Sequence, residues 1–349
     1  MRLGITSDPA TGARHFPAGA VVQRTLDGRS GDLYALSCLT PPSEPLFEPY
    51  TVRFTRDAQG FRNAPDLPAT VDLVVLGDSF TEAESVQQPF WESLAPTVYN
   101  LGLPDSGTLE QLALLKAHGL ARGPKTVVLA YFGGNDLQNN ADFAALRAAN
   151  QTYESRAWRA PLAQFLVTPR LVAFLAAPRL TCPYPIQDRQ SSPLAFYEPF
   201  FANAMLPPDA LRQTEPWKLT SDALRETATA TKAAGVRFIV VYIPFKAQTH
   251  VEQLTDAQLA DLRARVSPEP FGYELHTAAP FSLEAFDAQR ALLAELAAES
   301  GFEFLDLTPA FRAAAARGEQ RYFYGDTHWN QNGHDMAHDQ IAAVLAESL

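Results

Sequence analysis

The sequence predicts an α/β protein in which helices cover both faces of a parallel sheet of about five strands. Short apolar runs rich in β-branched residues recur along the chain, which is the pattern of strands buried on both faces. Segments with apolar residues at helical spacing alternate with these runs, and this alternation is typical of a parallel sheet. The expected strands are 71–77, 98–100, 126–132, 236–243 and 302–307.

The expected helices lie between and after these strands, at 89–96, 109–122, 221–235, 285–301 and 330–349. Gly235 and Gly301 end two of these segments, at the position where a glycine commonly stops a helix. The chain between the third and fourth strands is too long for one crossover connection. It has helical stretches within 141–178 and a loop-rich segment at 181–199, so we expect a helical insertion at about 138–220.

The N-terminal residues 1–70 contain many Gly and Pro and show little helical periodicity. PPSEPLFEP at 41–49 is expected to be extended, because the residue before a proline avoids helical backbone. YTVRF at 50–54 is expected to be a short edge strand. We therefore expect 1–70 to form an arm packed on a single domain at 71–349.

The composition is that of an ordinary globular protein. Hydrophobic residues make up 46% and charged residues 19% of the 349 residues, which is enough to bury a full core. The formal net charge is −11 and Lys and Arg form no run. The chain therefore lacks the clustered basic face with which proteins bind nucleic acid or anionic lipid, and we expect no nucleic acid partner.

We expect neither a metal nor a cofactor. No group of residues has the ligand spacing of a zinc or calcium site, and Gly133-Gly134 is too short to be a phosphate loop. Cys38 and Cys182 lie far apart in the sequence. Two free thiols are the simpler expectation for them, and a disulfide is the alternative that would suit an exported protein.

No apolar run reaches the ~18 residues of a membrane-spanning helix, and the first residues lack the basic-then-apolar pattern of a signal peptide. We expect a chain that is soluble as given. Export in bacteria would require a signal or anchor removed from this sequence.

Three consecutive predicted strands end in small and polar residues. The first ends in GDSFT at 77–81, the second in NLG at 100–102 and the third in GGND at 133–136. Ligands of open parallel sheets bind at the carboxyl ends of the strands, so these segments are expected to meet. A nucleophilic serine explains them together, because its hydroxyl needs a base and the tetrahedral intermediate needs hydrogen-bond donors.

Ser79 would begin a helix directly after a buried strand, with its hydroxyl exposed. Its own N–H, the N–H of Gly102 and the side-chain amide of Asn135 could converge on one oxyanion. A base and an acid are available in YFYGDTHWNQNGH at 322–334. Taken singly, each residue has a structural alternative: Ser79 and Asn135 as helix caps, and Gly102 as a turn glycine.

Four segments resemble, in the same order, the four conserved blocks of the SGNH/GDSL hydrolase superfamily. They are GDSFT at 77–81, Gly102, GGND at 133–136 and DTHWNQNGH at 326–334. The resemblance implies a flavodoxin-like three-layer α/β/α sandwich, and it leaves the arm and the insertion unassigned. It also implies that Ser79 is the nucleophile, that His328 and Asp326 complete the triad, and that Ser79, Gly102 and Asn135 form the oxyanion hole.

The spacing of the acid and the base departs from the family pattern. The usual order is Asp-x-x-His, whereas only Thr327 separates Asp326 from His328. Residues i and i+2 can lie on one side of an extended segment, so contact is possible, and a surface aspartate is the alternative. Asp335 and His338 have the usual spacing but fall in the predicted final helix. We favour His328, because the residues after it fit those that follow the catalytic histidine in the family.

Two features resemble enzymes that act on polysaccharides. Asp-x-His is similar to a block of alginate-type O-acetyltransferases of the same superfamily, although those place it before the serine. GFRN at 60–63 resembles bacterial members found near polysaccharide genes. Lys246 lies after the fourth strand and is expected to be solvated, with substrate contact as the alternative. Trp329 could line the pocket or fill the core.

The predicted function is hydrolysis of short-acyl or carbohydrate acetyl esters through an acyl-enzyme. One alternative is transfer of acetyl to a polysaccharide hydroxyl at the same site, and another is a non-catalytic carbohydrate-binding module. The complete set of Ser, Gly, Asn, Asp and His disfavours the binding module. An α/β-hydrolase is disfavoured because Thr81 stands where the nucleophile elbow has a glycine. The insertion and the loop at 266–282 are expected to shape the acceptor side.

Overall fold

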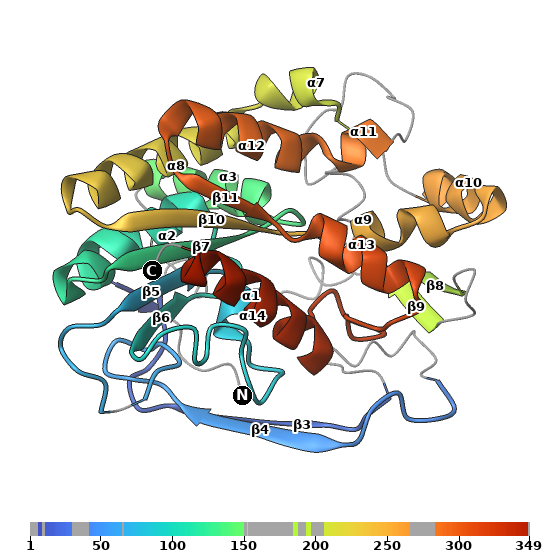
Figure 1. The fold of residues 1–349 in the computed structure, drawn as a ribbon, viewed down its shortest axis with the longest axis horizontal. Helices are drawn as coiled ribbons and strands as arrows, with labels where there is room; N and C mark the ends of the chain where they lie inside the picture. The colour runs from blue at the N-terminus through green and yellow to red at the C-terminus, as the bar shows by residue number, and fades with distance from the viewer. Residues whose placement is uncertain are drawn as a thin grey trace, which may run out of the picture.

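The computed structural model describes residues 6–8, 11–29, 42–64, 66–149, 152, 184–187, 193–196, 206–265 and 283–347. Its centre is a sheet of five strands in the order β11-β10-β7-β5-β6, and every pairing in this sheet is parallel (Figure 1). The strands are β5 (Leu73–Gly77), β6 (Val98–Gly102), β7 (Thr126–Phe132), β10 (Arg237–Ile243) and β11 (Glu303–Asp306). The predicted parallel sheet is confirmed, and each predicted strand agrees with an observed one to within two residues.

Helices alternate with these strands along the chain. They are α1 (Ser79–Glu82), α2 (Thr108–Leu114), α3 (Asp136–Ala148), α7 (Pro208–Arg212), α8 (Glu215–Ala233), α9 (Lys246–His250), α10 (Asp256–Arg265), α11 (Leu283–Phe286), α12 (Ala288–Ser300), α13 (Thr308–Ala316) and α14 (Gln331–Ala346), with short turns η1 (Leu115–Gly119), η2 (Leu120–Arg122) and η3 (Val251–Gln253). Four of the five predicted helices are present, as α2, α8, α12 and α14. Gly235 and Gly301 have φ values of +68° and +74°, the left-handed backbone of a glycine that ends a helix.

The helix predicted at 89–96 is wrong, because turns occupy this segment. Ser93 has a φ of +67°, which interrupts helical backbone. Phe90 is buried in the core, and the indole N–H of Trp91 donates to the carbonyl of Thr81 at 2.6 Å. The apolar residues that suggested a helical stripe therefore reach the core from a turn.

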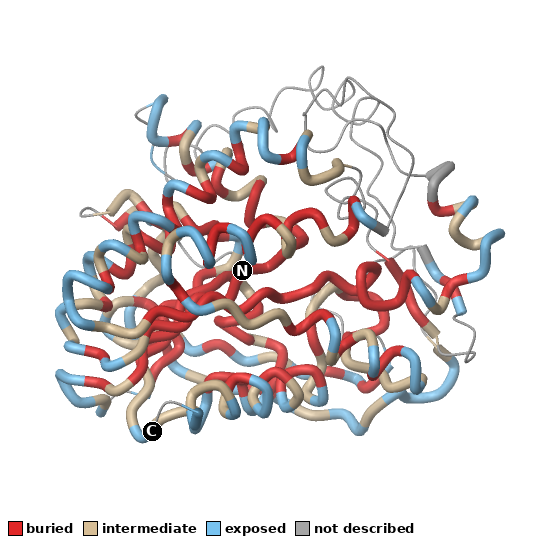
Figure 2. Tube along the Cα trace, turned by 45° about the horizontal axis from the view of Figure 1, so that its top comes forward, coloured by how far each residue is buried: buried red, intermediate tan, exposed pale blue. Residues whose placement is uncertain are grey.

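Two apolar cores lie on opposite faces of the sheet, because successive side chains of a strand point to opposite faces. In β5, Leu73 and Val75 belong to one core, whereas Val74 and Leu76 belong to the other. Side chains of α1, α13 and α14 join the first core, and those of α2, α8 and α12 join the second. Figure 2 shows that the buried residues concentrate in the strands. The predicted three-layer α/β/α sandwich is confirmed.

The described residues before the sheet form two antiparallel ribbons. β3 (Val21–Leu26) pairs with β4 (Tyr50–Thr55), and β1 (Thr6–Ser7) pairs with β2 (Arg14–His15). The strand expected at 50–54 is present as β4, but it pairs with β3 and is not an edge of the central sheet. The β3–β4 ribbon lies along the lower edge of the molecule in Figure 1.

The expected insertion contains a hairpin where the sequence suggested mostly loop. This hairpin consists of β8 (Tyr184–Gln187) and β9 (Pro193–Phe196). Within the described parts of the chain, no helix is long and apolar enough to cross a membrane. α3 occupies the start of the segment 141–178, in which helical stretches were expected. Outside the described residues lie 153–178, the loop at 266–282, Cys38 and Cys182.

The buried guanidinium of Arg62 fastens the segment that follows α1. It donates to the carbonyl oxygens of Ala83, Val86 and Gln87, with the last two at 3.2 Å. Burial lowers the pKa of Arg62 to about 10, against the opposing effect of Glu92. The guanidinium therefore remains charged at pH 7 and satisfies three carbonyls at once.

Two neighbouring contacts fasten the same N-terminal region. Arg56 forms an ion pair with Glu82 at the end of α1, and both side chains are almost fully buried. Asn63 exchanges two hydrogen bonds with the backbone of Asn100, at 2.9 and 2.8 Å. The GFRN segment at 60–63 therefore joins the N-terminal region to β6 and to the end of α1.

Arg62→Ala is expected to lower the free energy of unfolding by about 3 kcal/mol, because each buried carbonyl left without a donor costs roughly 1–3 kcal/mol. Urea unfolding followed by circular dichroism measures the change. The control is Arg53→Ala, which removes an exposed arginine of β4 and should change stability by less than about 0.5 kcal/mol. Equal unfolding midpoints for the two variants would show that Arg62 does not stabilise the fold.

Candidate active site

The turn between β5 and α1 presents the hydroxyl of Ser79. A Cβ at Gly77 would lie 2.1 Å from Oγ1 of Thr81, so the tight turn requires glycine. The carboxylate of Asp78 accepts the N–H of Phe80 at 2.9 Å and thereby caps α1. The capping role considered for Ser79 belongs to Asp78, and the Ser79 hydroxyl is left for another partner.

A chain of hydrogen bonds joins Ser79, His328 and Asp326. Oγ of Ser79 lies 2.7 Å from Nε2 of His328, and Nδ1 of His328 lies 2.7 Å from Oδ1 of Asp326. The same carboxylate oxygen accepts the backbone N–H of His328 at 3.1 Å, so the side chain of Asp326 bends back over one residue. The alternative acid, Asp335, instead accepts a hydrogen bond from Gln331 within α14 at 2.8 Å.

The loop that carries Asp326 and His328 is anchored by Trp329. This indole is 1% exposed. It stacks on Phe311 with the ring centroids 4.9 Å apart and meets Phe80 edge-on at 5.0 Å. Trp329 therefore fills the core behind the site and also lies in the wall of the pocket beside Ser79, so both roles expected for it apply.

The buried Asp326 and the partly buried His328 form an acid–base pair. Burial disfavours protonation of His328, but the carboxylate of Asp326 outweighs this effect and raises the pKa of His328 to about 9. Burial likewise acts to raise the pKa of Asp326, but the imidazole outweighs it and the pKa is lowered. The ionised carboxylate can therefore hold the ring through Nδ1–H and stabilise an imidazolium.

The geometry around Gly102 requires a correction of the expected oxyanion hole. The Gly102 N–H donates to Oδ1 of Asn100 at 2.7 Å, so it already has an acceptor. A Cβ at Gly102 would lie 2.4 Å from the backbone nitrogen of Glu82. The glycine therefore permits close packing of β6 on α1. The sequence feature that indicates this contact is Asn100, because an asparagine side chain can bond to the backbone two residues later.

The side chain of Asn135 is not used to hold the fold. Asn135 occupies the N-cap position of α3, but its side chain makes no capping hydrogen bond. Its Oδ1 is buried without a partner among the described residues. Asn135 follows β7, the neighbour of β5 in the sheet, so its amide lies at the sheet edge that carries Ser79 and is available for a ligand.

A small pocket of about 50 Å³ lies beside Ser79 and His328. Pro104 and Asp105, which follow β6, form part of its wall. Asp105 has a φ of +54°, which is uncommon for a residue with a Cβ, and its N–H has no partner among the described residues. Sequence reasoning missed Asp105. The available signal was the turn sequence PDSG at 104–107 directly after a buried strand.

Two carboxyl groups are buried beneath the site. Burial raises the pKa of Asp78 to about 7. Burial, with the charge of Asp78, raises the pKa of Asp136 well above its usual range. Both shifts favour the protonated form of these carboxyl groups. Among the residues that the structure describes, no group of three or more His, Cys, Asp and Glu side chains could hold a metal ion.

A serine hydroxyl bonded to a histidine that a carboxylate holds is typical of enzymes that cleave esters. The chain is a hydrolase that acts on esters, because it belongs to the GDSL-like lipase/acylhydrolase family, whose model matches residues 75–336. The predicted membership of the SGNH/GDSL superfamily is thereby confirmed. No curated protein matches the sequence.

Several solved structures are similar to this chain at low sequence identity. A GDSL-like lipase from Bacteroides thetaiotaomicron is 12% identical, with 82% of this chain and 93% of that chain covered and a TM-score of 0.41. A lipase/acylhydrolase from Enterococcus faecalis is 14% identical, with 80% and 97% covered and a TM-score of 0.39. A catalytic mutant of an acetylxylan esterase from Geobacillus stearothermophilus is 11% identical, with 79% and 93% covered and a TM-score of 0.38. Similarity this low does not identify the substrate of this chain.

The value of kcat/KM is expected to rise with pH through the pKa of His328, about 9, because only the neutral imidazole can take the Ser79 proton. Asp326→Asn removes the charge that raises this pKa, so the limb of the pH profile should move to lower pH. The maximal rate should fall by about 10⁴-fold, because the amide favours the wrong tautomer. Profiles with p-nitrophenyl acetate and NMR titration of His328 measure both effects. An unmoved limb in Asp326→Asn would contradict the pairing.

Proposed function

We propose that this enzyme hydrolyses short-acyl esters, acetyl esters of carbohydrates included, with Ser79 as nucleophile, His328 as general base and Asp326 as the acid of the triad. The observation that carries the proposal is the hydrogen-bonded chain from Ser79 Oγ through both ring nitrogens of His328 to Asp326 Oδ1. In this order, Ser79 can attack the ester carbonyl, His328 can accept the hydroxyl proton and Asp326 can stabilise the imidazolium.

The reaction follows from these contacts. Oγ of Ser79 attacks the ester carbonyl carbon while Nε2 of His328 takes the hydroxyl proton. The tetrahedral intermediate collapses to an acyl-enzyme, and the imidazolium gives its proton to the departing alcohol. Water then attacks the acyl carbon with His328 again as base, and the carboxylate product leaves with Ser79 restored. Asp326 holds Nδ1–H throughout and balances the imidazolium charge.

The oxyanion of each intermediate would be bound by three donors. The N–H of Ser79 lies at the start of α1 and has no acceptor among the described residues. The Asn135 side chain makes no hydrogen bond there either. The N–H of Asp105 borders the same pocket as Ser79, and it takes the place first given to Gly102. Donors fixed before the reaction stabilise developing charge without reorganisation.

The size of the pocket supports a short acyl group. About 10–15 Å³ is needed to hold one water molecule, so a pocket of about 50 Å³ has room for a few heavy atoms. Carboxylates of Glu84 and Asp105 lie on its wall, and the chain carries a net charge of −11. Neutral esters are therefore favoured over anionic ones.

Ser79→Ala is expected to abolish turnover of p-nitrophenyl acetate and labelling by a serine-directed phosphonate. Ser85→Ala is the control, because Ser85 lines the same pocket without contacting His328, and it should retain both activities.

With an oligosaccharide added at millimolar concentration, we expect acetyl to go mainly to water. Predominant transfer to the sugar would replace the hydrolase by an acetyltransferase with the same triad. Absence of products and of labelling in the wild type would favour a binding module.

Asn135→Ala is expected to lower kcat by roughly 10²–10³, the usual effect of losing one oxyanion donor, with little loss of stability. Asp105→Val should lower kcat about 100-fold, because a β-branched residue resists positive φ and would displace the N–H. Asp105→Gly keeps the N–H and suits that backbone, so kcat should stay within about threefold. If both Asp105 variants lose activity equally, the carboxylate matters and the N–H is not the donor.

A further inference from the structure

Lys246 is buried directly behind the loop that carries Asp326 and His328, called the catalytic loop below. It begins α9 and is 4% exposed, so the expectation of a solvated side chain is wrong. The alternative of substrate contact is wrong as well, because Nζ donates to the carbonyls of Phe323, Ala195 and Tyr324 at 2.6, 3.0 and 3.1 Å. An ammonium has three N–H donors. All three are used within the protein.

The three carbonyls come from two separate segments. Ala195 lies in β9, whereas Phe323 and Tyr324 lie in the loop that leads to Asp326. That part of the loop has no helix or long strand to hold it. The ammonium therefore ties the β8–β9 hairpin and the catalytic loop to the end of β10.

Asp326 is the acid that balances the charge of Lys246. Burial lowers the pKa of Lys246 to about 7, and Asp326 opposes this shift. Lys246 in turn contributes to the lowered pKa of Asp326. Oδ1 of Asp326 bonds to His328, but Oδ2 is buried without a hydrogen-bond partner among the described residues. An ionised carboxylate with one unpaired oxygen needs a nearby positive charge.

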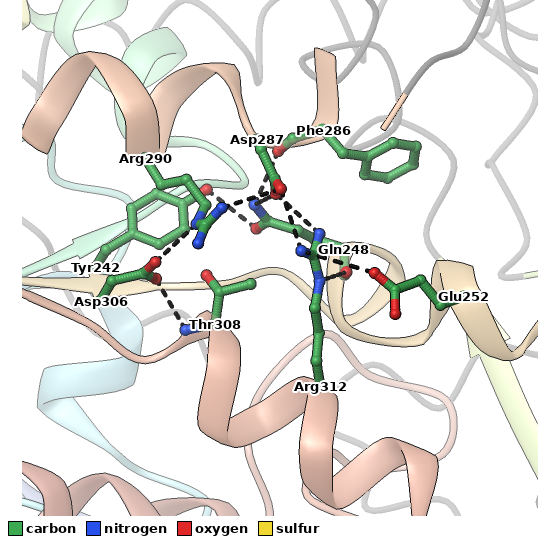
Figure 3. A network of polar contacts seen from close by, with 9 residues as sticks. All are labelled: Tyr242, Gln248, Glu252, Phe286, Asp287, Arg290, Asp306, Thr308 and Arg312. Atoms are coloured by element: carbon green, nitrogen blue, oxygen red, sulfur yellow. Dashed lines mark hydrogen bonds and ion pairs between the residues drawn. The ribbon is translucent and has the colours of Figure 1, made fainter. Parts of the chain in front are cut away.

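The element that carries Lys246 is itself rigidly held. Figure 3 shows Gln248 of α9 at the centre of a polar network. Its side chain accepts from the Tyr242 hydroxyl at 3.0 Å and donates to the Phe286 carbonyl at 2.8 Å. Arg312 donates to the Gln248 carbonyl at 3.2 Å and to Asp287 at 2.8 Å. Lys246 therefore extends from a base fixed to β10, α11, α12 and α13.

We infer that Lys246 is a positioning residue of the triad: its ammonium holds the Phe323–Tyr324 backbone and supplies the positive charge that keeps Asp326 in place as an ionised partner of His328. This inference rests on the proposed function. Lys246 bonds to neither Ser79 nor His328, so it acts only through the Phe323–Tyr324 backbone and the charge of Asp326. Its loss should therefore lower kcat and leave KM nearly unchanged.

Lys246→Met removes the charge and keeps the length of the side chain. It is expected to lower kcat and the rate of phosphonate labelling about 100-fold, the scale of a misplacement of about 1 Å, with KM within about threefold. NMR should show loss of the far-downfield proton of a histidine Nδ1–H held by a carboxylate. Tyr322→Phe is the matched control, because the Tyr322 hydroxyl ties the same loop to Pro244 at 2.8 Å without charge. It should keep the resonance and kcat within about threefold.

The failures of the two proposals are distinguishable. If Ser79→Ala keeps ester turnover, the proposed function falls and the role of Lys246 falls with it. If Ser79 is essential but Lys246→Met keeps kcat within threefold, or loses no more than Tyr322→Phe, only the role of Lys246 falls. If Lys246→Met does not fold, Lys246→Gln is the neutral variant that can still donate to the carbonyls. The same loss of kcat and of the resonance is expected for it, and their retention would overturn the inference.

Discussion

The parallel register of β5 with its two neighbours is the constraint on which the site depends. Gly77, the last residue of β5, pairs with Gly102 of β6 and with Ala130 of β7. The chain therefore leaves three adjacent strands at nearly one level and at the same edge of the sheet. An antiparallel neighbour would carry its loop to the opposite edge, and no local contact could bring that loop back to Ser79. The contacts of the proposed triad therefore depend on the pairing of strands that are distant in the sequence.

The segments that carry the proposed triad have little regular structure of their own. α1 is a helix of four residues, far below the length at which helices are stable alone. The loop before α14 has one isolated antiparallel bridge, between Tyr322 and Trp329. Their buried carbonyls need donors that water cannot supply. Arg62 donates to three carbonyls that follow α1. Lys246 donates to two carbonyls in the catalytic loop and to one in β9. A long cationic side chain can satisfy several carbonyls at once, so a few buried cations order the irregular parts of the site.

The sequence predicted the features that depend on short-range pattern. The five strands follow from apolar runs, and Ser79 follows from its place after a buried strand. Two predictions from local pattern were wrong. The apolar residues at 89–96 suggested a helix, but Ser93 adopts a left-handed backbone. Gly102 was predicted as a donor because glycine permits close approach. That approach is real, but it is toward α1, and the side chain of Asn100 accepts the N–H.

What the sequence could not predict depends on burial by distant segments. A lysine after a strand is almost always solvated, and Lys246 is buried only because β9 and the catalytic loop converge on it. Asp105 has a side chain where a donor turn would favour glycine, so only its observed φ separates it from an ordinary turn residue. Both residues belong to no local pattern. The role of each residue can be recognised only once the positions of the strand ends are known.

Exclusion of water shifts the pKa of each titratable group of the site in a direction that depends on its neighbours. Burial, with the charge of Asp105, raises the pKa of Asp78 to about 7. Burial, with the charges of Arg62 and His328, lowers the pKa of His334 to about 3, so each group tends toward its neutral form. Asp326 is buried and His328 is partly buried, yet their pKa values move in the opposite directions, because each charge stabilises the other. The same dry surroundings that neutralise isolated groups therefore strengthen this pair. A base able to carry a proton during attack on an ester is left at one position, beside the hydroxyl of Ser79.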